Sequence, residues 1–102
     1  MMTHNKLVRD KIPRIIMADG KKANTRVLND KEYLKELIKK LKEEAGELEK
    51  EPSVEELADI KEVLIAIRQA MGVHSGELED TRRKKAASRG RFKEKIFLES
   101  IE

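Results

Sequence analysis

Cysteine and tryptophan are absent from this chain of 102 residues, and its aromatic residues are one tyrosine and two phenylalanines. Without cysteine, the chain has no disulfide framework, no zinc–thiolate site and no thiol nucleophile. With so few aromatic residues, the core has to be aliphatic. No apolar run approaches the roughly 18 residues of a membrane span, and the N-terminus lacks the apolar stretch of a signal peptide. These absences predict a cytoplasmic protein with no membrane partner.

Charge, by contrast, is abundant and segregated. The chain has 23 Lys or Arg and 20 Asp or Glu, so the net charge of +3 hides the pattern. Residues 43–59 hold eight acids and one base, whereas residues 82–95 hold eight bases and one acid. Residues 6–22 add six bases and two acids. Charge runs are usually solvated helix faces, but an acidic centre between two basic flanks asks for a further explanation.

Apolar spacing predicts three main helices, over about residues 30–51, 53–71 and 75–88. Asn29 or Asp30 suits the N-cap of the first helix, and Pro52 follows its end. Ser53 and Glu56 have the spacing of a capping box at the start of the second. Glycines suit the ends of the second and third helices, at Gly72 and Gly90.

The terminal segments are less regular. Residues 12–18 predict a short helix with Pro13 in its first turn, closed by Asp19 and Gly20. Residues 25–28 and 95–98 are short β-prone runs that could pair. The whole chain is therefore expected to form one domain, residues 1–102, with an all-α helical bundle and short irregular or β-like terminal segments.

The second predicted helix is apolar around nearly its whole circumference. Its apolar residues are Leu57, Ala58, Ile60, Val63, Leu64, Ile65, Ala66, Ile67, Ala70 and Met71. A helix of this kind is buried on all sides, and one short chain with two other sizeable helices can hardly enclose it. We therefore expect oligomerisation to complete the bundle, as a homodimer or a homotetramer.

Carboxylates interrupt the apolar seams of the first two predicted helices. Positions 56, 59, 63, 66 and 70 share one helical stripe, in which Glu56 and Asp59 are the acids. Glu44 falls in the stripe of positions 37, 41, 44 and 48, and Glu47 lies at its edge. Four carboxylates are thus expected to point toward the bundle interior or a cleft that opens from it.

Carboxylates at such positions destabilise a fold unless something pairs them, because a buried lone carboxylate neutralises. A bound cation would explain why four carboxylates lie together. Oxygen donors suit magnesium, or manganese, and need no histidine. The two histidines, His4 and His74, form no metal-ligand spacing. The alternative is that the glutamates are ordinary surface residues and that Glu56 serves only the capping box.

Three segments of the chain resemble a known family. Residues 43–48 (EEAGEL) and 56–60 (ELADI) resemble the EExxE…ExxD signature of the MazG-type all-α nucleoside triphosphate pyrophosphohydrolases, which include phosphoribosyl-ATP pyrophosphohydrolase. Residues 5–13 (NKLVRDKIP) and 88–92 (SRGRF) resemble the phosphoribosyl-ATP pyrophosphohydrolase-like branch. Together these segments reach across most of the chain.

The resemblance implies hydrolysis between the α- and β-phosphates of a nucleotide, which gives a monophosphate and pyrophosphate, with clearance of non-standard nucleotides as one expected role. It implies that the magnesium ligands are Glu44, Glu47, Glu56 and Asp59, and that Glu43 orients a water molecule or an outer-shell group. Cationic side chains would have to hold the phosphate tail, and the candidates are Arg9, Lys11, Lys84 and Arg89. Asn5 and Asp10 would contact the base or the sugar.

The identity of the base stays open. Residues 82–84 stand where many of these enzymes have an asparagine, and Arg91 replaces the second glycine of an RGGF-like segment.

Two other functions compete with hydrolysis. An oligomeric helical protein could bind nucleic acid through residues 82–95 without catalysis, with an affinity that falls steeply with salt. Against this, the strip has a single aromatic residue, Phe92, and no recognised nucleic-acid motif, so nucleic acid is not the expected partner. Alternatively, a similar bundle could bind a nucleotide as a regulator without turning it over.

Overall fold

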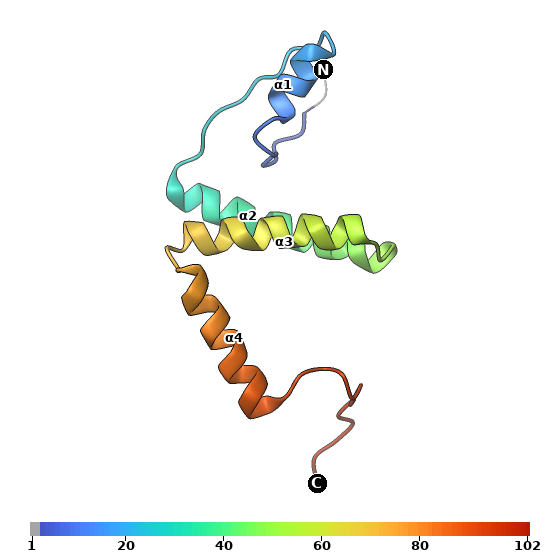
Figure 1. Ribbon diagram of the computed structural model, residues 1–102. Helices are drawn as coiled ribbons and strands as arrows, with labels where there is room; N and C mark the ends of the chain where they lie inside the picture. Colours follow the sequence, from blue (N-terminus) through green and yellow to red (C-terminus); the bar gives the residue numbers. More distant parts are fainter. Residues whose placement is uncertain (1–2) are drawn as a thin grey trace. The chain divides into compact units, whose positions relative to one another are not determined.

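The computed structural model describes residues 3–102, which form four helices joined by irregular segments (Figure 1). The helices are α1 (Ile12–Ala18), α2 (Asp30–Lys50), α3 (Val54–Ala70) and α4 (Ser75–Arg89). Their bounds lie within one residue of the predicted ones, which is the margin expected at helix ends. The all-α fold class is therefore confirmed.

Side-chain caps explain where the two longest helices begin. The Asn29 side chain accepts a hydrogen bond from the Glu32 amide at 2.8 Å, and Ser53 Oγ accepts one from the Glu56 amide at 3.2 Å. Each cap satisfies an amide that has no partner within its helix. Pro52 separates the two helices, because proline cannot continue the hydrogen-bond pattern of α2.

Helix α4 begins and ends at residues with distinct roles. His74 Nδ1 accepts a hydrogen bond from the Gly76 amide at 3.1 Å and so caps the helix. Gly90 ends it with a φ of 84°, a left-handed value that favours glycine. Gly90 is a helix end predicted from the sequence, whereas the cap at His74 is not, because histidine is not among the preferred N-cap residues.

Helices α2 and α3 run antiparallel and side by side, joined by the short turn after Lys50 (Figure 1). The buried core between them is small. Leu37 of α2 is 4% exposed and Val63 of α3 is 9% exposed, and these two are the buried apolar residues of residues 3–102. Leu37 and Val63 belong to the two apolar stripes predicted from the sequence. The same stripes carry the acids Glu44, Glu56 and Asp59 toward the turn of the hairpin.

A second apolar stripe on α3 is uncovered. Leu57 and Leu64 of α3 and Met71 at its C-cap are 57%, 47% and 60% exposed, and their spacing of seven residues places them on one side of the helix. The chain by itself therefore buries only one side of α3. Burial of the remaining surface by a second copy stays a prediction.

The contacts divide the chain into an N-terminal unit that ends at Gly72 and a C-terminal unit, Val73–Glu102. The single domain predicted for residues 1–102 therefore stays a prediction. Residues 25–28 and 95–98 form no strand, nor does any other part of residues 3–102. Runs of four residues contribute few ladder hydrogen bonds, and an isolated pair of strands is marginal in water. No helix within residues 3–102 combines the length and the apolar character that a membrane crossing requires.

Candidate metal centre

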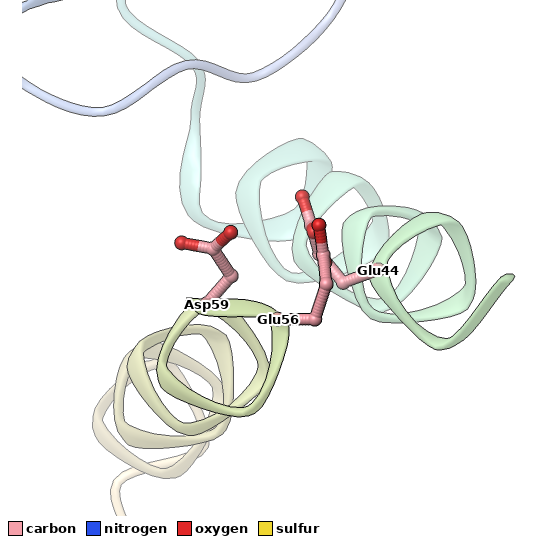
Figure 2. A group of neighbouring side chains, drawn as sticks. All are labelled: Glu44, Glu56 and Asp59. Carbon is pink, nitrogen blue, oxygen red and sulfur yellow. The ribbon is translucent and has the colours of Figure 1, made fainter. Parts of the chain in front are cut away.

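Three of the four predicted metal ligands come together where α2 ends and α3 begins. Glu44 is supplied by α2, and Glu56 and Asp59 by α3 (Figure 2). One carboxylate oxygen of each residue lies within 4.8 Å of the others. The arrangement follows from the sequence, because the short turn at Pro52 folds the acidic end of one seam onto the acidic start of the next.

Glu56 is the carboxylate with the least compensation. Its Oε2 is buried and has no hydrogen-bond partner among the described residues. Contact with the Glu44 carboxyl raises the pKa of Glu56, and partial burial and the negative charges of Glu44, Asp59 and Glu47 act in the same direction. The backbone amide of Glu56 donates to Ser53 Oγ at the helix cap, and its side chain lies beside those of the other two acids (Figure 2).

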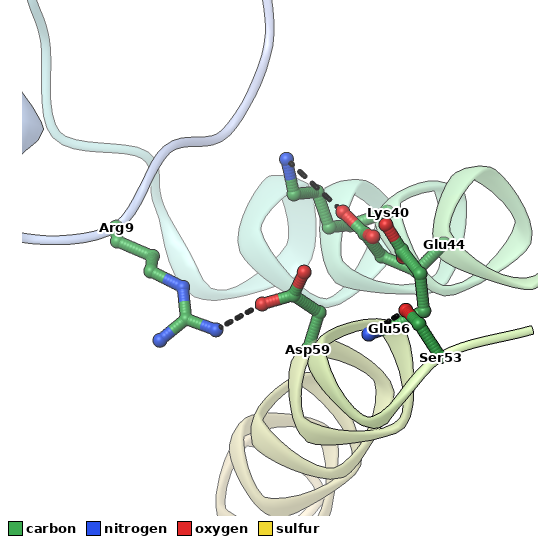
Figure 3. Close-up of polar contacts among 6 residues, drawn as sticks. All are labelled: Arg9, Lys40, Glu44, Ser53, Glu56 and Asp59. Atoms are coloured by element: carbon green, nitrogen blue, oxygen red, sulfur yellow. Dashed lines mark hydrogen bonds and ion pairs between the residues drawn. The ribbon is translucent and has the colours of Figure 1, made fainter. Parts of the chain in front are cut away.

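Two cationic side chains lie at the edges of this acidic cluster of Glu44, Glu56 and Asp59 (Figure 3). Arg9 Nη2 donates a hydrogen bond to Asp59 Oδ1 at 2.7 Å, across fifty positions of the sequence. Lys40 Nζ lies 3.9 Å from Glu44 Oε1, one helical turn away on α2. The spacing of four residues on one helix predicts the pair of Lys40 and Glu44, but no local sequence pattern predicts the pair of Arg9 and Asp59.

The fourth predicted ligand, Glu47, is not part of the cluster. Its side chain is exposed and lies 3.9 Å from Lys50 Nζ. Its charge still contributes to the raised pKa of Glu56, so it lies at the edge of the same electrostatic environment. Glu43 is exposed on α2, beside Glu44 in the sequence. Their roles as fourth ligand and water-orienting residue stay predictions.

The residues predicted to hold phosphate differ in their placement. Arg9 reaches the cluster through Asp59, whereas Asn5 and Lys11 are exposed in the same N-terminal segment. Asn5 has a φ of 42°, a left-handed conformation that asparagine tolerates better than most residues. Lys84 and Arg89 are exposed on α4, within the C-terminal unit. Their part in the site stays a prediction.

Helix α4 compensates its own charges locally. Glu79 accepts hydrogen bonds from Arg82, and Arg83 Nε lies 3.3 Å from Glu79 Oε1. The hydrogen bonds and charge of Arg82, with the charge of Arg83, lower the pKa of Glu79 to about 2. The basic strip of residues 82–95 thus begins with two arginines that already have an acidic partner.

The donor chemistry of the cluster fits a hard divalent cation. Three carboxylates within 4.8 Å, one with a buried oxygen that lacks a partner, match the oxygen ligands that magnesium and manganese prefer. Two surface hollows lie elsewhere, one lined by Asp30, Tyr33, Gln69 and Ala70 and the other by residues of α2 between Lys35 and Lys42. Neither hollow includes a residue of the cluster.

Comparisons with known proteins found no match to this chain among family models, curated proteins or solved structures.

Proposed function

We propose that this protein is a magnesium-dependent nucleotide pyrophosphohydrolase that cleaves between the α- and β-phosphates. The observation that carries the proposal is the gathering of Glu44, Glu56 and Asp59, with a buried, unpartnered oxygen on Glu56. Like charges at this separation destabilise the metal-free fold, so the arrangement is understandable if a cation binds there. The motif resemblance across residues 43–60 adds the reaction class to this electrostatic argument.

Each residue then has a stated role. Glu44, Glu56 and Asp59 would hold magnesium, or manganese, and Glu47 would complete the set from the edge. When bound, the ion supplies positive charge against the phosphate oxygens and makes water more acidic. Glu43 would orient the attacking water. Water adds across the anhydride, the bridging P–O bond breaks, and a nucleoside monophosphate and pyrophosphate leave.

The substrate needs cations as well as a metal, because its phosphates would otherwise be repelled by the acidic cluster. Arg9 is the best-placed candidate, since it already lies against Asp59. Lys11, Lys84 and Arg89 would add charge along the phosphate tail, and Asn5 would contact the base or the sugar. Glu79 offsets part of the positive charge of Arg82 and Arg83, so residues 82–95 offer a nucleic acid less net charge than that segment alone suggests.

A substrate screen tests the proposal directly. The wild-type protein is incubated with Mg²⁺ or Mn²⁺ and canonical, oxidised, deaminated and phosphoribosyl nucleotides, and pyrophosphate release is measured by a coupled phosphate assay. We expect turnover of at least one nucleotide and near-complete loss in Glu44→Gln and Asp59→Asn. Glu55→Gln is the matched control, because Glu55 is an exposed acid beside Glu56 and outside the cluster.

No turnover across the panel would contradict the enzymatic proposal. If a nucleotide bound without turnover, the regulatory function would be favoured instead. Binding of DNA or RNA at physiological salt that does not change in Glu44→Gln would favour the nucleic-acid function.

We also propose that the protein acts as a homo-oligomer, a dimer or a tetramer, in which a second copy covers the stripe of Leu57, Leu64 and Met71. The support is the exposure of these apolar side chains on a helix that one chain cannot enclose. Light scattering on the wild type should give a mass of at least two chains, and Leu64→Glu should reduce it. Gln69→Glu adds the same charge to exposed α3 surface away from the stripe and should not. A wild-type monomer would contradict the proposal.

A further inference from the structure

The N-terminal arm, residues 3–20, is attached to the helical hairpin by a contact of limited strength. None of the residues of α1, the helix of this arm, is buried. Arg9 joins the arm to α3 through its hydrogen bond to Asp59, and 59% of the Arg9 side chain is exposed. An exposed ion pair of this kind stabilises a contact only modestly and weakens with salt. The arm is therefore poised to separate from α3 if something competes for Asp59.

A divalent cation is such a competitor. The Arg9 guanidinium donates to Asp59 Oδ1 and places a positive charge beside the acidic cluster (Figure 3). A cation held by the three carboxylates would be coordinated by an oxygen of Asp59. Its positive charge would repel the Arg9 guanidinium at close range. Lys40 differs, because it lies 3.9 Å from Glu44 and is anchored on the same helix, so the ion need not displace it.

We propose that Arg9 is the internal counter-ion of the cation-free cluster and that a divalent cation displaces it from Asp59. The inference rests on the proposed function, since it takes the cluster to be the cation site. Displacement releases the arm from α3 and frees the Arg9 guanidinium to pair with an anionic group such as a phosphate. Arg9 then becomes free to bind an anionic group only after the cation has bound. The same residue pairs with Asp59 in the cation-free site and with the anionic group in the cation-bound one.

The linkage is reciprocal. If the cation weakens the Arg9–Asp59 pair, loss of that pair must strengthen cation binding by the same factor. An exposed ion pair is worth about 0.2–1 kcal/mol, which corresponds to a change of about 1.5- to fivefold in affinity. This is the gain in Mg²⁺ affinity that we expect for Arg9→Gln.

Two measurements test the proposal. Isothermal titration with Mg²⁺ compares the wild type, Arg9→Gln and the control Arg14→Gln, which removes an equal charge from the exposed surface of the same arm. Binding should be about 1.5- to fivefold tighter in Arg9→Gln than in Arg14→Gln. Side-chain NMR of ¹⁵N-arginine in the wild type should show the Arg9 guanidinium signals shifting with Mg²⁺ and the Arg14 signals unchanged.

The outcomes separate this inference from the proposed function. If the wild type binds Mg²⁺ while Arg9→Gln matches Arg14→Gln and the Arg9 signals do not move, the displacement is wrong and the metal centre stands. If the wild type shows no Mg²⁺ binding, both fail. The NMR measurement uses the wild-type chain, so the test remains decisive even if a variant does not fold.

Discussion

Glu56 on α3 and Glu79 on α4 are both helical glutamates near other charges, but their neighbours shift the pKa in opposite directions. Contact with the Glu44 carboxyl raises the pKa of Glu56, whereas the hydrogen bonds and charge of Arg82 lower that of Glu79 to about 2. The carboxylate on α4 is satisfied by the chain itself. The one on α3 lies against another carboxyl, and one of its oxygens is buried without a hydrogen-bond donor within residues 3–102. This difference separates a carboxylate paired within its own helix from a group of carboxylates that could hold a metal ion.

The largest expected difference between the two regions concerns the binding of Mg²⁺. Glu56→Gln removes a ligand charge from the cluster, so its Mg²⁺ affinity should fall by at least the roughly 10- to 100-fold that loss of an outer-shell partner costs a metal site. Glu79→Gln makes the same chemical change in a residue that the arginines already neutralise, so its affinity should match the wild type. Isothermal titration calorimetry measures both. Equal losses of Mg²⁺ affinity in the two variants would contradict the idea that only the α2–α3 acids bind the ion.

The stability of the metal-free protein should depend on pH through Glu56. Because the native pKa is raised above the ordinary value of 4.5, the native state binds this proton more tightly than the unfolded chain does. The resulting stability is fully present below about pH 4.5 and is lost as the pH rises through the raised native pKa. Thermal unfolding without metal should therefore show a midpoint that falls over this window.

Glu56→Gln provides the control for this pH dependence, because glutamine stays neutral. Its unfolding midpoint should change less over the same window and should exceed that of the wild type at pH 8 without metal. Added Mg²⁺ should raise the wild-type midpoint at pH 8 and leave that of Glu56→Gln nearly unchanged. A wild type that is more stable than Glu56→Gln in the absence of metal would show that the cluster carries no net repulsion.

The smallest effect belongs to the pair on α4. Its depressed pKa means that Glu79 contributes stability above pH 4.5 and loses it as the pH falls through about 2. The side-chain carbon signal of Glu79 should titrate near pH 2, and Arg82→Gln should move the midpoint upward. An unchanged midpoint in Arg82→Gln would mean that the arginine does not hold the carboxylate in solution.

Local signals in the sequence were enough to locate the helices. Asn29, Ser53 and Gly90 mark ends that the structure confirms, because caps depend on neighbours a few residues away. Glu44, Glu56 and Asp59 could be brought together in advance because both stripes and the turn between them are short-range features. The placement of these three acids thus follows from the helical period together with the short turn at Pro52.

What could not be predicted depends on contacts between distant segments. The pairing of Arg9 with Asp59 joins residues fifty positions apart, and no periodicity relates them. Glu47 lies at the edge of the stripe, as its spacing predicts, with Lys50 Nζ 3.9 Å from its carboxylate, and its role as a fourth ligand stays a prediction. His74 is an exposed residue whose ring nitrogen caps α4, a role that its residue type does not suggest. These outcomes are set by tertiary geometry and rotamers rather than by residue type.

The central claim is that the acids of the α2–α3 hairpin form a divalent-cation site and that the acid of α4 does not. The most direct test is a titration with Mn²⁺ followed by ¹H–¹⁵N NMR, because a bound paramagnetic ion broadens signals steeply with proximity. If the ion binds at the hairpin, the amide signals of Glu44, Glu56 and Asp59 vanish first, at a small fraction of an equivalent, and before that of Glu79. Broadening that begins at Glu79, or that is uniform along the chain, would contradict this claim.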